Sequence, residues 1–403
     1  MHAKRQSGRS KVVTVVIAVV VLAVGGGLVA YVLSGSSSSA GSNATPAVPT
    51  TLKLPVLSVL PADGATEIPI DSTVSVIADV GRISAVTVAD DSGTTISGAL
   101  DGGGKAWRSS GGLALKTSYA VTVDAVGPSG RPMQQVTHFK SLVPAAILGL
   151  TLTPSKGLTV GIAQPIVFRF DHNVTNKDAL ISKLHITATP AVNGGWKWFS
   201  PKELHFRPEK YWPTGQQVTV KADLANFDAG AGIWATASST TSFTVGDAHV
   251  STVNVATHVM TVTSNGKAIA TYPISAGRTK YPTMGGIHID LYRQQDVHMI
   301  SSSVGIPVNS ADGYDEHVFW NVNITDGGEF VHAAPWSTGA QGRSNVSHGC
   351  VNLSPANAQA FYNFSRIGDV IEVVGSPRAP DLGDHGTMDW NTPWAAWAPA
   401  TTA

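Results

Sequence analysis

Short runs in which apolar and polar residues alternate occupy most of the chain after residue 54. Alternation of this kind places every second side chain on one face and is typical of half-buried β-strands. The runs are separated by Gly, Pro, Asn and Asp, which favour turns. The pattern therefore predicts a mainly β protein.

Residues 55–145 and 146–246 follow one plan. The first copy opens at Leu60-Pro61-Ala62-Asp63-Gly64-Ala65 and the second at Thr153-Pro154-Ser155-Lys156-Gly157-Leu158, and each opening precedes an alternating apolar run. Strands of this length, broken by frequent turns, predict two tandem immunoglobulin-like β-sandwiches. Tyr119, in the strand that closes the first copy, is a candidate tyrosine corner, whereas the second copy has Gln216 at that position.

Residues 247–374 form a third region that is also rich in alternating runs. Asn265-Gly266 lies between two such runs and predicts a hairpin turn. One helix is expected over 354–364, because Ser354 suits the N-cap and Pro355 the first helical position. A strand from Asp369 to Val374 follows. The last stretch, 375–403, carries Trp390, Trp394 and Trp397, which are four and three positions apart and could form one aromatic stripe. We therefore expect this stretch to dock on another domain.

The N-terminal 33 residues predict a membrane anchor. Four basic residues precede an uncharged apolar run from Val12 to Leu33. As a helix this run would measure about 33 Å, enough to cross a hydrocarbon core of about 30 Å. The basic flank should stay cytoplasmic, which places the remainder of the chain outside. A cleaved signal peptide is the alternative. Residues 34–54, rich in Ser and Gly, are expected to be a flexible linker.

The charge balance and the cysteine content limit which binding partners and which disulfides the chain can have. The chain carries 27 basic and 27 acidic residues, so its formal net charge is zero. This balance gives no indication of a nucleic-acid partner, which normally needs a basic patch. Cys350 is the only cysteine, which excludes an internal disulfide. A lone cysteine in an exported protein is either buried and inert or kept for its reactivity.

Cys350 lies in a sequence that favours reactivity. His348 and Asn352 flank it at a spacing of two, so all three side chains would share a face if this segment were an extended strand. His332 ends an apolar strand upstream and can take the proton of a thiol that is mostly protonated at neutral pH. Backbone N–H groups near Gly349 and Cys350 can form an oxyanion hole. A buried core histidine and a zinc site made by the cysteine and the two histidines are the competing interpretations.

His332, a gap of fourteen residues and Ser347-His348-Gly349-Cys350-Val351-Asn352 are similar to the signature of the YkuD-type L,D-transpeptidases. The segments around Tyr272-Pro273-Ile274 and Tyr281-Pro282-Thr283 match the same family. The order of anchor, two immunoglobulin-like modules, catalytic domain and Trp-containing end resembles the mycobacterial-type subgroup. The resemblance covers nearly the whole chain.

The resemblance implies roles for individual residues. Cys350 would be the nucleophile, His332 the base and then the acid, and the main-chain carbonyl of Ala333 the third member of the triad. His348 and Gly349 would shape the surroundings of the cysteine. The residues that match the substrate groove are Ser347, Tyr314, Gly327, Gly328 and Asn352, and residues 300–320 match the lid over the site. Asp228 begins a loop similar to one that binds calcium in some relatives, but Ala231 stands where an acidic residue is needed, so we predict no metal and no cofactor.

The implied reaction is the formation of 3→3 cross-links in peptidoglycan. A donor stem tetrapeptide would acylate Cys350 and release D-alanine, and a second stem peptide would accept the acyl group. β-Lactams of the carbapenem type would be covalent inhibitors, the anchor would engage the membrane, and no nucleic acid would bind.

Three alternatives remain at this point. Water as the acceptor would make the protein an L,D-carboxypeptidase. A papain-like endopeptidase is disfavoured, because its cysteine precedes its histidine and opens a helix. A non-enzymatic anchored wall-binding protein would explain the sandwiches but not the signature.

Overall fold

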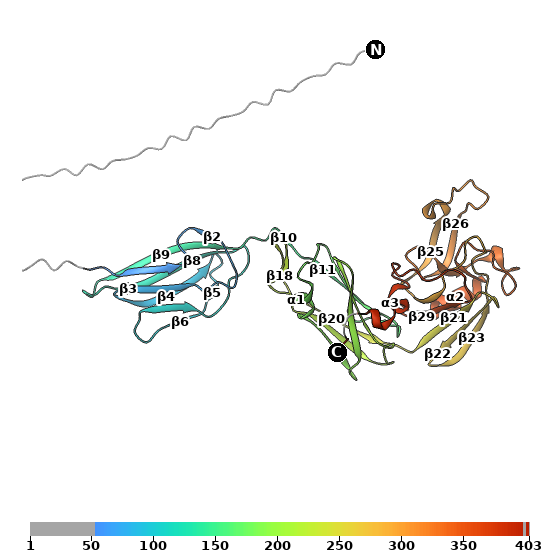
Figure 1. Ribbon diagram of the computed structural model, residues 1–403, viewed down its shortest axis with the longest axis horizontal. Helices are drawn as coiled ribbons and strands as arrows, with labels where there is room; N and C mark the ends of the chain where they lie inside the picture. The colour runs from blue at the N-terminus through green and yellow to red at the C-terminus, as the bar shows by residue number, and fades with distance from the viewer. Residues whose placement is uncertain (1–52, 398–399, 403) are drawn as a thin grey trace, which may run out of the picture. The chain divides into compact units, whose positions relative to one another are not determined.

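The computed structural model describes residues 53–397 and 400–402, and it is mainly β, as predicted (Figure 1). The expected anchor, 1–33, and residues 34–52 of the expected linker lie outside the described residues. Within the described residues no helix is long and apolar enough to cross a membrane.

Two sheets form the first sandwich, with strand orders β1-β3-β7-β6 and β2-β9-β8-β4-β5. Alternate side chains of β3 and β8 are buried between them, among them Val76 and Val121. The hydroxyl of Tyr119 accepts a 2.8 Å hydrogen bond from the amide of Ala114, as in a tyrosine corner. The strands are β1 (Val56–Leu60), β2 (Ala65–Ile68), β3 (Ser75–Val80), β4 (Arg82–Asp90), β5 (Thr95–Ile96), β6 (Gly98–Leu100), β7 (Ala106–Ser109), β8 (Ser118–Val126) and β9 (Pro132–Ser141).

The second sandwich pairs a sheet of order β11-β13-β16-β15-β30 with one of order β12-β20-β17-β14, and a small sheet β10-β19-β18 lies beside them. Ile166, Phe168 and Phe170, the alternating apolar residues of β13, are buried as the pattern predicts. The short helix α1 was not predicted. The elements are β10 (Ala146–Ile147), β11 (Leu150–Thr153), β12 (Thr159–Val160), β13 (Ile166–Phe170), α1 (Lys177–Ile181), β14 (Leu184–Thr189), β15 (Asn193–Ser200), β16 (Glu203–Pro208), β17 (Gln217–Ala222), β18 (Phe227–Gly230), β19 (Ile233–Ala235), β20 (Ser239–Val245) and β30 (Ala400–Thr402).

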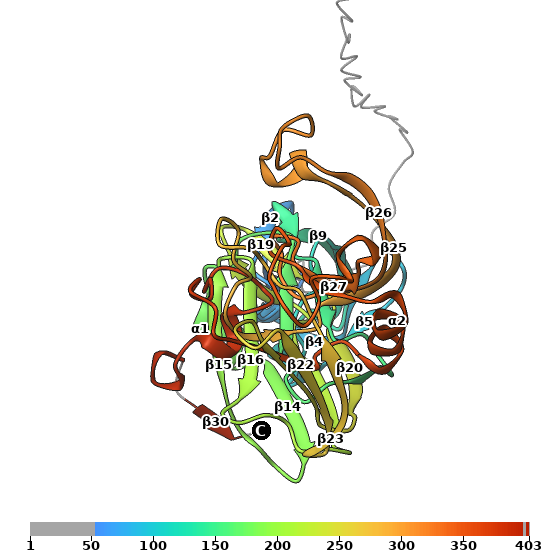
Figure 2. The ribbon, with the colours of Figure 1, turned by 90° about the vertical axis from the view of Figure 1, so that its right-hand side faces the viewer.

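The third region contains two sheets, β23-β22-β21-β29-β24 and β25-β26-β27-β28, which share one apolar core with helix α2. The β25–β26 hairpin curves away from the other strands (Figure 2). The elements are β21 (His249–Asn254), β22 (Val259–Ser264), β23 (Lys267–Pro273), β24 (Gly286–Ile289), β25 (Tyr292–Ile300), η1 (Ser301–Val304), β26 (Asp315–Asn323), β27 (Phe330–Ala333), η2 (Pro335–Ser337), β28 (Val351–Leu353), α2 (Pro355–Phe364) and β29 (Val370–Val374).

Local sequence signals in this region are confirmed. Asn265 and Gly266 both have positive φ, 50° and 77°, as a tight hairpin turn between β22 and β23 requires. Helix α2 begins at Pro355, and the side chain of Ser354 accepts a hydrogen bond from the amide of Asn357, 3.3 Å away. This bond satisfies one of the donors that a helix N-terminus leaves free.

The second sandwich and the third region share apolar packing. Ile289 and Val370 are buried in the same cluster as the core of the second sandwich. The backbones also meet at Gly161, whose amide donates to the carbonyl of Ile367, 2.8 Å away. A Cβ at Gly161 would come within 2.2 Å of the amide nitrogen of Asp369, so only glycine permits this approach.

The C-terminal segment contacts the second sandwich through its tryptophans. The indole of Trp390 donates to the carbonyl of Ala163, and that of Trp397 donates to the carbonyl of Gly195, both at 2.7 Å. The rings of Trp390, Trp394 and Trp397 surround the guanidinium of Arg207 at 4.4 to 4.9 Å. The segment contains α3 (Met388–Asn391) and η3 (Trp394–Ala396).

Candidate active site

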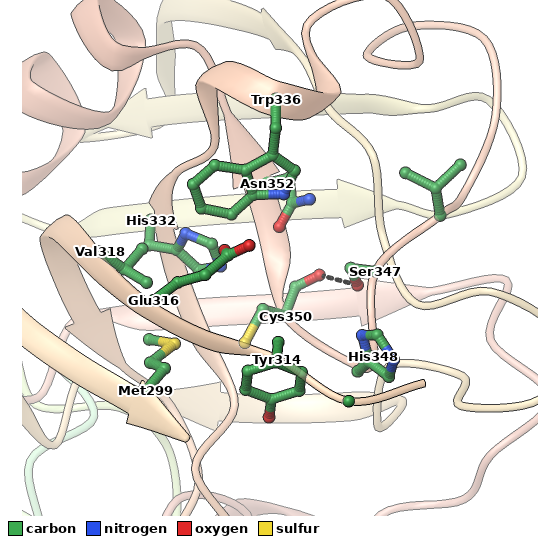
Figure 3. A pocket seen from close by; sticks show the side chains of 12 residues that line it. Met299, Tyr314, Glu316, Val318, His332, Trp336, Ser347, His348, Cys350 and Asn352 are labelled. Carbon is green, nitrogen blue, oxygen red and sulfur yellow. Dashed lines mark hydrogen bonds between the residues drawn. The ribbon is translucent and has the colours of Figure 1, made fainter. Parts of the chain in front are cut away.

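A pocket of about 260 Å³ opens between the β25–β26 hairpin and the loop that carries Cys350 (Figure 3). Strands β27 and β28 run parallel at its base, with His332 paired to Asn352 in register. The beginning of β26 and the residues just before it supply the opposite wall. The lining residues are Met299, Gly313, Tyr314, Glu316, Val318, His332, Trp336, Val346, Ser347, His348, Cys350 and Asn352.

The thiol of Cys350 is partly buried in this pocket. Burial raises the pKa of the thiol to about 12, because the charged thiolate loses solvation. The sulfur lies 3.8 Å from the carbonyl oxygen of Gly328. At neutral pH the resting cysteine therefore carries its proton and needs a base to become a nucleophile.

His332 is 3% exposed and has a fixed tautomer. Its Nδ1 lies 2.9 Å from the carbonyl oxygen of Ala333. Because a carbonyl only accepts, Nδ1 carries the proton, and Nε2 of the neutral ring is left as an acceptor. Burial lowers the pKa of His332 to about 4, so the ring is neutral at pH 7.

The loop before β28 is held by local hydrogen bonds. The hydroxyl of Ser347 donates to the carbonyl of Cys350 at 2.6 Å (Figure 3). The same hydroxyl accepts from the amide of Gly349 at 3.1 Å. Thr283 donates to the carbonyl of Gly349 at 2.6 Å. The amide of Gly349, expected as an oxyanion donor, is thus already bonded within the loop.

The extended strand expected through residues 348–352 is wrong in its first half, because β28 begins only at Val351. Gly349 has φ of 131°, a conformation that side chains disfavour, and it turns the chain. His348, Cys350 and Asn352 nevertheless all line the pocket. Their common placement comes from the loop and not from strand alternation.

His348 is tied to the hairpin by a network that the sequence did not reveal. Its Nε2 lies 2.7 Å from Nη2 of Arg278, which only donates, so this nitrogen accepts. Arg278 also pairs with Asp312. Asp312 accepts further bonds from Lys280 at 2.5 Å and from the hydroxyl of Tyr281 at 3.0 Å. Burial and the charge of Arg278 lower the pKa of His348.

Asn352 and Tyr314 reach the pocket from opposite sides. The side-chain amide of Asn352 donates to Ser337 at 3.1 Å, and its Oδ1 has no partner among the described residues. The ring centroid of Tyr314 lies 5.1 Å from that of His348. Oδ1 of Asn352 is buried, since that residue is 3% exposed.

Of the ten residues predicted for the site, six line the pocket and four do not. Ala333 and Gly349 contact residues that do line it: the carbonyl of Ala333 accepts from His332, and the amide of Gly349 donates to Ser347. Gly328 places its carbonyl beside the thiol, and the amide of Gly327 donates to Asp384 at 3.2 Å. Residues that line the pocket but were not predicted include Met299, Glu316, Val318 and Trp336. Glu316 and Val318 belong to residues 300–320, the segment matched to a lid, and Met299 directly precedes that segment.

Comparisons with known proteins agree with this geometry. Residues 248–373 match the family described as the YkuD L,D-transpeptidase catalytic domain, and residues 65–228 match the bacterial Ig domain family. L,D-transpeptidase 2 of Mycobacterium tuberculosis is 37% identical over 346 residues, which cover 86% of this chain and 85% of that protein. L,D-transpeptidase 5 of the same species is 31% identical over 351 residues, covering 85% and 76%.

A solved structure of the L,D-transpeptidase LdtMt1 in complex with imipenem superposes with a TM-score of 0.50 at 34% identity. It covers 58% of this chain and 100% of that one.

Proposed function

The chain belongs to the L,D-transpeptidase family, and we propose that it forms 3→3 cross-links in peptidoglycan through an acyl-enzyme on Cys350. The observation that carries this proposal is the fixed tautomer of His332. Its free Nε2 is an acceptor, and the ring lines the same pocket as a thiol that cannot ionise by itself.

In the first step His332 accepts the proton of Cys350 through Nε2. The sulfur attacks the carbonyl carbon of the third residue of a donor stem tetrapeptide, and a tetrahedral intermediate forms. When it collapses, the bond to the nitrogen of D-alanine breaks and His332 protonates the departing amine. Cys350 is left as a thioester, and the ring is neutral again.

In the second step the side-chain amine of another stem peptide attacks the thioester carbon. His332 removes the proton of that amine, and the carbon–sulfur bond breaks as the new amide forms. The thiolate regains the proton from His332. The carbonyl of Ala333 supports both transfers, because its bond to Nδ1 stabilises the positive ring that forms in each.

The groove residues suit a peptide substrate. Asn352 lines the groove, and Tyr314 and Trp336 offer aromatic faces on either side of the thiol (Figure 3). The carbonyl of Gly328, which lies 3.8 Å from the sulfur, supports a place for Gly328 at the edge of the groove, and the place of Gly327 there stays a prediction. The imipenem complex of LdtMt1 supports carbapenems as acylating inhibitors of this chain too.

Incubation with a disaccharide tetrapeptide, followed by mass spectrometry of enzyme and products, tests the proposal. We expect an acyl adduct on Cys350 and a cross-linked dimer, and neither with Cys350→Ala. Tripeptide without dimer would show that water is the acceptor and that the protein is an L,D-carboxypeptidase. If the parent chain formed no adduct and Cys350→Ala still bound the cell wall, the protein would have only a binding function.

We also propose that residues 1–33 anchor the chain in the cell membrane, with residues 55–145 and 146–246 as spacer domains and 247–374 as the catalytic domain outside. The uncharged run of 22 residues and its basic flank support the anchor. Fractionation of the full chain and of a chain that lacks 1–33 tests it: the full chain should sediment with membranes and the shortened chain should not.

A further inference from the structure

Two histidines and a glutamate converge where the second sandwich meets the C-terminal segment. Glu203 and His205 lie two apart on β16, so their side chains share a face, and His385 comes from the segment before α3. The Nε2 atoms of His205 and His385 lie 2.7 and 2.6 Å from the same oxygen, Oε1 of Glu203. All three candidate ligand atoms fall within 4.8 Å of one another.

The outer nitrogen of each ring is held by a second carboxylate. Nδ1 of His205 lies 2.9 Å from Asp389, and Nδ1 of His385 pairs with Asp326. Because carboxylates only accept, both Nδ1 atoms carry protons. This arrangement is the one found around metal-binding histidines, where a carboxylate fixes the tautomer and aims the other nitrogen at the ion.

A small cavity beside the cluster holds carboxylates that lack partners. It measures about 100 Å³ and is lined by His205, His385, Asp389, Asp290 and Arg169, among others, and Nε of Arg169 donates to the second oxygen of Glu203 at 3.2 Å. Asp290 is 0% exposed, and neither oxygen of its side chain has a hydrogen-bond partner among the described residues. Oδ2 of Asp389 is likewise unpartnered there. Buried carboxyl groups without donors are costly to ionise, and a cation in the adjoining space would favour their charged form.

We propose that Glu203, His205 and His385 form a divalent-metal site of the two-histidine, one-carboxylate type that suits Zn²⁺. Imidazole and carboxylate ligands in a set of three leave a fourth position for water, for which the cavity provides room. Glu203 can accept from both Nε2 atoms only if each ring carries two protons. A divalent ion brings the same two positive charges and binds the rings in their neutral form.

The site would join elements that lie far apart in the sequence. Asp326, which holds His385, immediately precedes the Gly327-Gly328 turn, and the carbonyl of Gly328 lies beside the thiol of Cys350. The ion would therefore stabilise the contact of the second sandwich with the C-terminal segment and with this turn. It takes no part in the reaction proposed above, so either proposal can fail alone.

Metal titration of the full chain tests the site. The Cys350→Ala chain is the parent, because a thiol is itself a zinc ligand, and it is stripped with a chelator before calorimetric titration with Zn²⁺. We expect one equivalent to bind and to raise the melting temperature. His385→Gln should abolish both effects. Asp326→Asn, which changes only the carboxylate behind His385, should weaken binding by about 10- to 100-fold.

His185→Gln is the matched control, because His185 is an exposed histidine of the same sandwich that faces Asp223. It should bind Zn²⁺ as the parent does. Co²⁺ gives a second readout, since the visible bands of tetrahedral Co²⁺ should appear in the parent and not in His385→Gln. Failure of the parent to bind Zn²⁺ would overturn the proposal and leave a cluster held by protons alone. Binding that is unchanged in both His385→Gln and Asp326→Asn would also overturn it, since the ion would then lie elsewhere.

Discussion

The ring of His332 is fixed by the carbonyl of its own neighbour, Ala333, 2.9 Å from Nδ1. Any residue at position 333 supplies a main-chain carbonyl oxygen, so this contact does not depend on the side chain there. The contact determines which ring nitrogen can accept the proton of Cys350. It also adds little charge to the pocket, because a neutral carbonyl replaces the carboxylate that holds the histidine in many catalytic triads.

The pH dependence of acylation should have its acid limb near pH 4. Burial lowers the pKa of His332 to about 4, so the base is neutral above that pH and is lost as pH falls through it. The second-order rate of Cys350 acylation by imipenem, followed by intact mass, reports ionisations of the free enzyme. His348→Gln serves as the control and should keep the same inflection. An inflection near 6.5 would contradict the assignment of a buried neutral base.

The resting thiol should react slowly with an alkylating reagent. Because burial raises the pKa of Cys350 to about 12, thiolate is scarce throughout the neutral range. Iodoacetamide labelling should keep rising with pH through the alkaline range and show no half-maximal rate near pH 8.5, the pKa of an unperturbed thiol. A cysteine in a short unstructured peptide is the reference, and its labelling rate should reach half its maximum near pH 8.5. A plateau of the enzyme between pH 6 and 9 would instead indicate a preformed thiolate–imidazolium pair.

Signals confined to a few neighbouring residues were predictable from the sequence. The turn at Asn265-Gly266 and the cap at Ser354 depend on the backbone preferences of those residues alone. The shape of the loop around Cys350 was not, because Ser347 bonds to Gly349 and Cys350 and so competes with strand pairing. Local side-chain bonds of this kind favour a turn over an extended strand.

Contacts between residues far apart in the sequence could not be predicted from the sequence either. His205 and His385 are 180 positions apart, and nothing in either segment indicates the other. The stripe of tryptophans in the C-terminal segment was visible as a spacing, but its partner, Arg207, was not. Arg278 and Asp312 likewise meet only because the fold brings the β25–β26 hairpin over the loop of His348.

Gly349→Ala should destabilise the third region and slow acylation. Its φ of 131° disfavours any side chain, and a Cβ would lie 3.1 Å from Oε1 of the buried Glu329. Strain of this type costs about 1 to 3 kcal/mol. Chemical denaturation and the imipenem acylation rate measure the two effects. Gly64→Ala is the control, since Gly64 has a φ of 76° with nothing within 4 Å of the added carbon. Equal losses in both variants would show that the contact with Glu329 is unimportant.

Arg207→Met should detach the C-terminal segment. The guanidinium of Arg207 is 3% exposed, lies 4.4 to 4.9 Å from three indole rings and donates to the carbonyl of Thr392 at 3.1 Å. A desolvated cation–π contact contributes about 2 kcal/mol, and methionine keeps the apolar stem but loses the charge. We expect the free energy of unfolding to fall by at least about 2 kcal/mol, and limited proteolysis to cleave within 375–403.

Arg293→Met is the matched control, because it removes one guanidinium that lies 5.5 Å from a single ring, that of Tyr362. Its loss should be smaller, within about 1 kcal/mol, since exposed cation–π contacts are weak. Arg207→Lys separates charge from shape: an ammonium keeps the charge but cannot stack flat between indoles. If the lysine variant matched the parent in stability and protease resistance, charge alone would hold the segment, and the planar packing of Arg207 among the three tryptophans would not be required.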